Sequence, residues 1–379
     1  MPVPSSELIT LRRQLHENAE LSHHESTTQT LLKDFLKNRS CESIIDLCDG
    51  KAFMAIFDSG KPGPHVVFRA DLDALPILEK PGKDYGSKNE GVSHMCGHDG
   101  HMTIVSSLAG GWQDVLTHGK LGLLFQHAEE LGEGAIEVMA DEAFLDWKPD
   151  HIFGFHNIPG EDLGTVVVGD KVFASASTGL RISIEGQTSH AAHPEMAKTA
   201  LKVIPKLLSL AETLEQSYPS ESFFLATPVQ VRIGEENFGI TPGDGRLSFT
   251  LRAFDEELLN KNMEQLLESC EELCREYGLS YKHELIEPFP STGIDEVMTQ
   301  VVAEATEELR SLTLQRRSYP YYWSEDFGHY TKKIKGSYFG LGIGKDKPSL
   351  HDPHYDFDDK ALEIYPELLS LILKKVLEE

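Results

Sequence analysis

The pattern of apolar residues changes near residue 179 and changes back near residue 287, and this change limits what the chain can fold into. Between these points apolar and polar residues alternate strictly, which is typical of strands with one face in a core and the other toward water. On either side the apolar runs are continuous, as in strands buried on both faces. We therefore expect a second domain inserted into the first. The alternating segments are Leu180/Ile182/Ile184, Val229/Val231/Ile233 and Leu247/Phe249/Leu251.

The inserted segment, residues 178–289, is predicted to be a ferredoxin-like α+β domain. Helical stretches at 195–217 and 255–277 lie between four predicted strands, and the resulting βαββαβ order is that of ferredoxin-like folds. The strands are expected at 179–187, 228–234, 246–253 and 279–287.

The flanking segments, 1–177 and 290–379, are predicted to form one discontinuous α/β domain with a helix-covered sheet. Apolar runs alternate with amphipathic helical patterns there, as in a sheet packed against helices. The runs lie at 66–68, 121–125, 152–155, 166–168 and 338–343, and the helices at 7–16, 25–37, 102–116, 294–310 and from 359.

The charge balance of the chain excludes several kinds of partner. It has 379 residues with 35 Lys+Arg and 61 Asp+Glu, a net charge of −26. Duplex DNA and anionic membranes are bound through surplus Lys and Arg, so neither is an expected partner. The N-terminus lacks the pattern of a signal peptide, which predicts a cytoplasmic location. The five cysteines are odd in number and mostly isolated, unlike a disulfide framework.

Potential metal ligands are densest in residues 94–101, which contain three His, one Cys and one Asp. A polar turn with a helix cap from Asp99 does not account for so many soft ligands in eight residues. The combination of thiol and imidazole groups indicates that this segment binds metal.

A pair of carboxylates, Glu129 and Glu130, follows the apolar run that ends at Phe125. Adjacent side chains of an extended segment point in opposite directions, so one carboxylate could bind a metal while the other faces a water as general base. A Glu-Glu pair is more often a solvated surface feature. The buried strand expected before it favours the catalytic interpretation.

Two isolated histidines, His156 and His351, also follow apolar residues. A single histidine usually only makes hydrogen bonds, but a metal site assembled from distant segments would show this pattern. Asp71 and Asp73 lie at i, i+2 on one face of an extended segment, where they could orient ligand histidines.

Several of these segments together resemble the motifs of the dinuclear-metal amidohydrolases, which include hippurate hydrolases, N-acyl-L-amino-acid amidohydrolases and auxin-conjugate hydrolases, a branch of the aminoacylase and carboxypeptidase metallopeptidase family. The similarity extends over nearly the whole chain. The matching segments are 15–21, 68–76, 94–99, 125–130, 154–156, 186–194, 324–327 and 350–353.

This resemblance implies a site with two divalent metal ions per subunit. It assigns Glu129 as general base and proton shuttle. Zn²⁺ suits the Cys and His ligands best, although Mn²⁺, Co²⁺ or Ni²⁺ could occupy the same set. The implied metal ligands are Cys96, His98, Glu130, His156 and His351.

The resemblance also implies roles for the inserted domain, as a lid and as a dimerisation surface of a homodimer. His190 matches a lid histidine that reaches across the dimer to the substrate carbonyl, and Arg252 a lid residue near the substrate carboxylate. The chain departs from its relatives at His127, where they commonly have Pro. It departs again at 239–242, where Gly-Ile-Thr-Pro replaces Asn-Val-Ile-Pro and Asn237 lies two positions away.

The expected activity is hydrolysis of the amide bond of N-acyl-L-amino acids by a metal-activated water. An enzymatic alternative is a metallo-exopeptidase of carboxypeptidase or dipeptidase type, and a non-enzymatic one is a regulatory or assembly module. Substrate size distinguishes the first alternative and metal content the second. A nucleophilic role for Cys96 is disfavoured because no separate base and orienting group is visible near it.

Overall fold

The computed structural model describes residues 1–80, 82–219 and 222–378. Its contacts divide the chain into two compact units, which are described separately here. Unit 1 comprises Met1–Phe173, Thr292–Ser318 and Asp326–Glu379, and unit 2 comprises Ala174–Ser291 and Tyr319–Glu325.

The second segment of unit 2, Tyr319–Glu325, differs from the sequence-based expectation, which placed these residues in the flanking domain. Hydrogen bonds explain the difference. The backbone N–H and the hydroxyl of Ser175 both donate to the Tyr321 carbonyl, at 3.1 and 2.6 Å. These bonds join residues 146 positions apart in the chain, so no local pattern could have indicated them.

Unit 1 is built on an eight-stranded mixed sheet of order β1-β2-β4-β3-β5-β14-β6-β13. The four central strands β4, β3, β5 and β14 run parallel to one another, so their carboxyl ends meet at one edge. The strands are β1 (Ser43–Leu47), β2 (Ala52–Asp58), β3 (His65–Asp71), β4 (Lys120–Gln126), β5 (His151–Ile158), β6 (Thr165–Gly169), β13 (Thr313–Arg317) and β14 (Lys335–Gly342).

Helices cover both faces of this sheet. Phe68, Phe125 and Phe153 belong to a buried cluster shared with α1, α2, α3, α9 and α11. Gly122, in the same strand as Phe125, lies against Met54 and against Trp147, the last residue of α6. The helices are α1 (Ser5–Glu17), α2 (Ser26–Lys37), α3 (His98–Ser107), α4 (Trp112–Val115), α5 (Gly134–Ala140), α6 (Glu142–Trp147), α9 (Glu296–Glu308), α10 (Gly328–Thr331) and α11 (Ala361–Glu378), with the 3₁₀ turn η1 (Cys48–Gly50).

The predicted helix at 102–116 is wrong in its limits. Helix α3 begins four residues earlier, at His98, and ends at Ser107. Gly110 and Gly111 interrupt the pattern, and Gly111 adopts a left-handed φ of 71°, which ends a helix readily. The short strands β1 and β13 and the buried strand β2 were not predicted.

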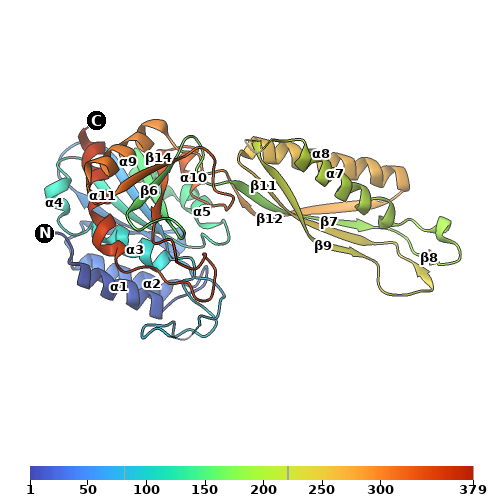
Figure 1. Cartoon of the computed structure of the whole chain (residues 1–379), viewed down its shortest axis with the longest axis horizontal. Helices are drawn as coiled ribbons and strands as arrows, with labels where there is room; N and C mark the ends of the chain where they lie inside the picture. Colours follow the sequence, from blue (N-terminus) through green and yellow to red (C-terminus); the bar gives the residue numbers. More distant parts are fainter. Residues whose placement is uncertain (81, 220–221, 379) are drawn as a thin grey trace. The chain divides into compact units, whose positions relative to one another are not determined.

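Unit 2 contains a four-stranded antiparallel sheet of order β12-β7-β11-β9. Helices α7 and α8 lie along one face of it (Figure 1) and share its buried cluster, so the predicted fold class of a covered mixed sheet with a ferredoxin-like insert is confirmed. The elements are β7 (Ala176–Glu185), α7 (Ile204–Gln216), β9 (Phe224–Ile233), β11 (Gly245–Ala253), α8 (Glu256–Tyr277) and β12 (Ser280–Phe289).

The predicted helix at 195–217 starts too early, because α7 begins only at Ile204. Lys198 exchanges two backbone hydrogen bonds with Gln187, of 2.7 and 3.0 Å, which hold this stretch in an extended form. The preceding residues form the 3₁₀ turns η2 (Pro194–Met196) and η3 (Ala200–Lys202), and the ribbon of β8 (Ser189–His190) and β10 (Ile240–Thr241) projects from the same region.

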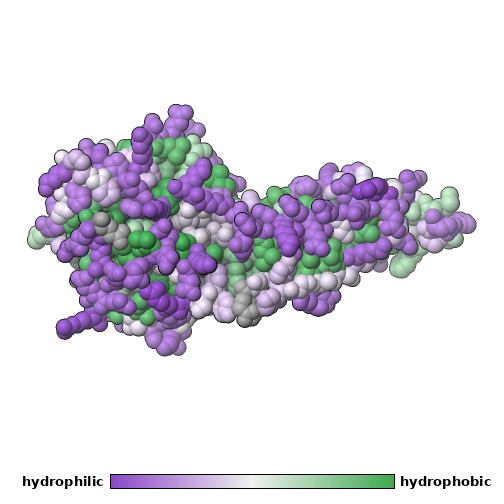
Figure 2. Space-filling model, turned by 90° about the horizontal axis from the view of Figure 1, so that it is seen from above, coloured by the Kyte–Doolittle hydropathy of each residue, from purple (hydrophilic) through white to green (hydrophobic). Residues whose placement is uncertain are grey.

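Polar residues dominate the surface. Hydrophilic side chains cover most of the face of both units shown in Figure 2. Among the described residues, no helix has the length and apolar character needed to cross a membrane.

Candidate metal centre

The candidate metal centre of unit 1 lies at the carboxyl ends of the parallel strands, where open α/β sheets place their sites. Asp71 is the last residue of β3, and Glu129 and Glu130 follow the end of β4. His156 lies near the end of β5, where it pairs with Gly340 of β14. Neighbouring strands thus bring together residues that are far apart in sequence.

The backbone at Cys96 and His98 requires the glycine between them. Gly97 has a φ of 89°, and a Cβ built on it would lie 2.5 Å from Asn157 Oδ1 and 2.8 Å from the Tyr355 hydroxyl. Gly97 is also the N-cap of α3, so His98 is the first residue of the helix. The sharp turn lets a thiol and an imidazole two residues apart face the same space.

All five residues predicted as metal ligands meet in this space. Their donor atoms form two overlapping groups, in each of which every pair lies within 4.8 Å, and both groups contain Cys96. Cys96 Sγ is 3.4 Å from His156 Nε2, and His351 Nε2 is 3.7 Å from Glu130 Oε1. The groups are Cys96/His98/His156 and Cys96/Glu130/His351.

Two buried donor atoms lack hydrogen-bond partners within the described part of the chain: His98 Nε2 and Glu130 Oε1. They are 3.8 Å apart, too far for a hydrogen bond. Leaving a buried polar atom unsatisfied costs about 1–3 kcal/mol, so such atoms call for a partner. A thiol, imidazoles and a carboxylate at these separations fit Zn²⁺ or a similar divalent cation.

A second layer of contacts orients these donors. The His98 ring donates from Nδ1 to the carbonyl of Asp73 at 2.9 Å, and the His156 ring donates from Nδ1 to the Asn157 carbonyl at 2.9 Å, leaving Nε2 of each as the ligand atom. Asp73 Oδ2 accepts from the Glu130 backbone N–H at 3.0 Å. This arrangement agrees with the outer-partner role expected for Asp73.

The pKa values show that protons compete with cations here. Burial opposes charge on His98, but Asp71, Asp73 and Glu130 outweigh it and raise its pKa to about 10. Burial, with the neighbouring carboxylates, raises the pKa of Cys96 well above its usual value and that of Glu130 to about 7. Cations bound at this site would replace these protons, because metal ligands must be deprotonated.

Glu129 is buried with 5% of its surface exposed, and its Oε2 lies 4.0 Å from His98 Nε2. The expectation that Glu129 and Glu130 point in opposite directions from an extended segment is wrong. Residues 129–130 form a turn, and Ala128 before them has a left-handed φ of 48°. The turn lets both carboxylates approach His98, with donor atoms of the three residues all within 4.8 Å of one another.

The two residues predicted to bind substrate, His190 and Arg252, both lie in unit 2. His190 is exposed on the β8–β10 ribbon, opposite Ile240. Its Nδ1 accepts the Ala192 N–H at 3.0 Å, so a neutral ring carries its proton on Nε2. Arg252 lies in β11 and donates from Nη1 to the Tyr322 carbonyl and the Ser324 hydroxyl, at 3.0 and 3.1 Å.

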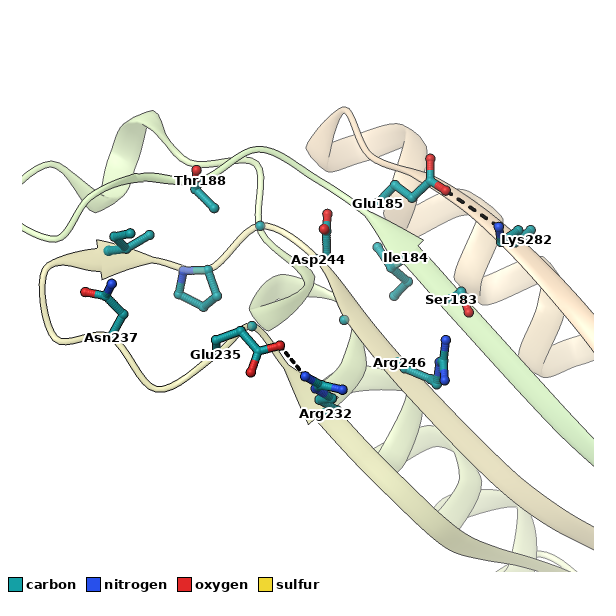
Figure 3. Close-up of a pocket in the computed structure, with 15 residues that line it drawn as sticks. Ser183, Ile184, Glu185, Thr188, Arg232, Glu235, Asn237, Asp244, Arg246 and Lys282 are labelled. Atoms are coloured by element: carbon teal, nitrogen blue, oxygen red, sulfur yellow. Dashed lines mark hydrogen bonds and ion pairs between the residues drawn. The ribbon is translucent and has the colours of Figure 1, made fainter.

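Asn237 lies beside a cavity of about 680 Å³ on unit 2 (Figure 3). Its side-chain oxygen accepts the N–H of Gly239 at 3.0 Å, so the amide stabilises its own turn. The charged walls of the cavity pair with one another, as Figure 3 shows for Glu185 with Lys282.

Sequence reasoning gave no role to His101, although it counted this residue in the histidine cluster. The structure places its Nδ1 2.8 Å from Asp71 Oδ1, and its ring packs 4.7 Å from that of His156. Its position one helical turn after His98 was the available signal, because residues at i and i+3 share a helix face.

The interpretation of Asp99 as a helix cap, considered from the sequence, does not include its main contacts. Its carboxylate is buried between Arg12 Nη1 and His16 Nδ1, at 3.2 and 2.8 Å. His16 in turn contacts Glu79 Oε1 at 3.1 Å, so a buried chain of charges supports the start of α3 from α1.

The sequence profile of peptidase family M20/M25/M40 matches residues 67–375, most of the chain. The chain belongs to this family. It is therefore a hydrolase, which confirms the coarse level of the resemblance seen in its motifs.

Individual relatives are similar to this chain over most of their length. The N-acetyl-L-cysteine deacetylase of Bacillus subtilis (strain 168) is 31% identical over 361 residues, covering 94% of this chain and 85% of the relative. Uncharacterized hydrolase SA1230 of Staphylococcus aureus (strain N315) is 29% identical, covering 95% and 96%. The crystal structure of Bacillus subtilis YXEP, described as a dinuclear metal binding peptidase from the M20 family, superposes with a TM-score of 0.84 at 25% identity, covering 99% and 98%.

Proposed function

We propose that the protein hydrolyses the amide bond of N-acyl-L-amino acids, in the manner of the hippurate and auxin-conjugate hydrolases. The observation that carries the proposal is the convergence of Cys96, His98, Glu130, His156 and His351 beside the buried carboxylate of Glu129. Similarity to an N-acetyl-L-cysteine deacetylase supports the choice of substrate class.

Two divalent cations are proposed for the two overlapping donor groups, with Cys96 available to both. When bound, such cations lower the pKa of a water and polarise an amide carbonyl. Similarity to a protein described as dinuclear metal binding supports the number of ions. Zn²⁺ suits the donor set best, and Mn²⁺, Co²⁺ or Ni²⁺ are accommodated by the same ligands.

Glu129 is proposed as the general base. Its carboxylate is held close to His98 and largely shielded from solvent, so it is positioned to take a proton from the attacking water and later to pass it to the leaving amino group. Its neighbour Glu130 is the proposed ligand, because its Oε1 lies within 4 Å of both His98 and His351.

Substrate recognition is proposed to come from unit 2 in a homodimer. The Nε2–H of His190 is exposed and suited to donate to the developing oxyanion of a neighbouring copy's substrate. The Arg252 guanidinium is oriented by neutral oxygens that leave its charge available to a carboxylate.

An assay panel tests the proposal. Acetyl-, benzoyl- and indole-acyl amino acids should be hydrolysed, their methyl esters poorly, and activity should disappear with a chelator and return with added cations. Preference for dipeptides or longer peptides over N-acyl amino acids would favour the exopeptidase alternative. Absence of stoichiometric metal, together with activity that a chelator does not change, would overturn the proposed mechanism.

A further inference from the structure

A second group of potential ligands lies in unit 1, apart from the candidate metal centre. It consists of Cys48, His127 and Glu137, whose donor atoms all lie within 4.8 Å of one another. They come from three segments: the turn η1 between β1 and β2, the turn after β4, and helix α5. None of the three is among the five residues proposed to hold metal for catalysis.

The separations are close to those around a tetrahedral cation. His127 Nε2 is 3.0 Å from Glu137 Oε2, whereas ligand atoms around a tetrahedral zinc lie roughly 3.3–3.8 Å apart. Small side-chain rotations would therefore admit an ion between them. The His127 side chain, which presents Nε2 to Glu137, is completely buried.

The charges around the group favour a cation. Asp141 Oδ2 accepts the backbone N–H of Cys48 at 2.7 Å, and a donor oxygen of Glu137 lies within 4.8 Å of the Cys48 thiol, so carboxylates surround the group. Burial lowers the pKa of His127, so its ring is neutral and able to act as a ligand.

Lys51 now neutralises part of this charge. Its ammonium group lies 2.8 Å from Glu137 Oε2, and its side chain is 40% exposed. A lysine at this exposure can turn into solvent when a stronger cation arrives. Lys51 also lines a cavity of about 450 Å³ together with His23, whose ring packs 5.5 Å from that of His127. The cavity therefore borders two neighbours of the group, Lys51 and His23.

We propose that Cys48, His127 and Glu137 form a separate Zn²⁺ site that ties the turn before Glu129 to α5 and to the β1–β2 connection. Thiolate and imidazole ligands select Zn²⁺ over Mg²⁺ or Ca²⁺. Three protein ligands leave one tetrahedral position for water. Because His127 lies two residues before Glu129, an ion here would limit the movement of the turn that carries the proposed general base.

Metal content tests this site independently of catalysis. The full-length protein is loaded with Zn²⁺ alone, desalted, and analysed by elemental mass spectrometry. The wild type should bind one equivalent more than Cys48→Ser and than His127→Gln. Cys41→Ser is the matched control, since Cys41 is also a free, half-buried cysteine but is not part of the group of Cys48, His127 and Glu137. It should keep the wild-type content, and circular dichroism should show all variants folded.

Alkylation of the wild-type protein gives a second readout that needs no substitution. Zn²⁺ should slow the reaction of Cys48 with iodoacetamide at least tenfold, measured by peptide mass spectrometry, while Mg²⁺ should not. Equal zinc contents in the wild type and both variants, or equal alkylation of Cys48 with and without Zn²⁺, would overturn the proposal.

Discussion

The two units carry their proposed functional residues in opposite ways. In unit 1 the donors of the candidate metal centre are mostly buried, and backbone carbonyls behind them hold the rings of His98 and His156 in place. In unit 2 His190 stands exposed on a two-stranded ribbon. Metal binding needs donors that converge before the ion arrives, whereas a residue that meets a substrate must remain accessible.

The buried polar residues of the two units differ in the same sense. Unit 1 buries charged groups in pairs, such as Arg12 with Asp99 and Arg69 with Asp71. In the segment Ala174–Ser291, the buried polar residues found among the described ones are neutral: Ser175, Ser177, Thr178, Thr199 and Asn262. Buried charges are stable only when paired, so unit 1 should respond to loss of a partner far more strongly than the segment Ala174–Ser291.

The largest expected effect is on the general base of unit 1. Glu129→Gln should lower turnover at least ~10²-fold, because the amide keeps the shape of the side chain but cannot accept a proton. Metal content should remain that of the wild type. Glu130→Gln is the matched control and should lower metal content itself, which elemental analysis measures. Near-normal turnover in Glu129→Gln would contradict the assignment of Glu129 as general base.

The next effect concerns His190 of unit 2. His190→Ala should reduce turnover about 10²-fold, as loss of one oxyanion donor does elsewhere. If His190 serves a neighbouring copy, mixing His190→Ala with Glu129→Gln should restore part of the activity, because a mixed dimer contains one site with both groups intact. Exchanged mixtures without any recovery would place His190 outside its partner's site.

A smaller effect is expected from the charged chain that supports α3. Burial alone would raise the pKa of Glu79, but hydrogen bonds from His16 and Lys83 outweigh it and lower it to about 2, from 4.5. The carboxylate therefore stabilises the fold fully above about pH 4.5, and this contribution is lost as the pH falls toward 2. Glu79→Gln should cost about 1–3 kcal/mol at pH 7, with the difference from wild type shrinking between pH 4.5 and 2 in denaturant titrations. A difference independent of pH would contradict this.

The smallest effect is expected at an exposed strand of unit 2. Val229 in β9 is 61% exposed, so Val229→Thr should change the free energy of unfolding by less than about 0.5 kcal/mol. Metal content should be unchanged. A loss of several kcal/mol in urea titrations would show that this face is covered in solution, for instance by a second copy.

The sequence indicated more of the candidate metal centre than of the fold around it. Local density alone marked residues 94–101 as a candidate ligand segment, and the pair after a strand marked Glu129 and Glu130 without deciding which of them binds metal. His351 is different, because its position depends on a backbone hydrogen bond to the Met95 carbonyl of 2.9 Å across the fold. The sequence marked it only as an isolated histidine after apolar residues, and the family motif assigned it as a ligand.

Local periodicity was sufficient to separate two folding patterns, to indicate the ferredoxin-like insert, and to mark the dense ligand cluster. These features depend on residues a few positions apart, whose side chains share a strand face or a helix face. Tertiary structure decided the rest: the turn that brings Glu129 and Glu130 to His98, the place of Tyr319–Glu325 in unit 2, and the meeting of Cys48 with His127. Each of these depends on contacts between distant segments, which form only when the sheet and its helices pack together.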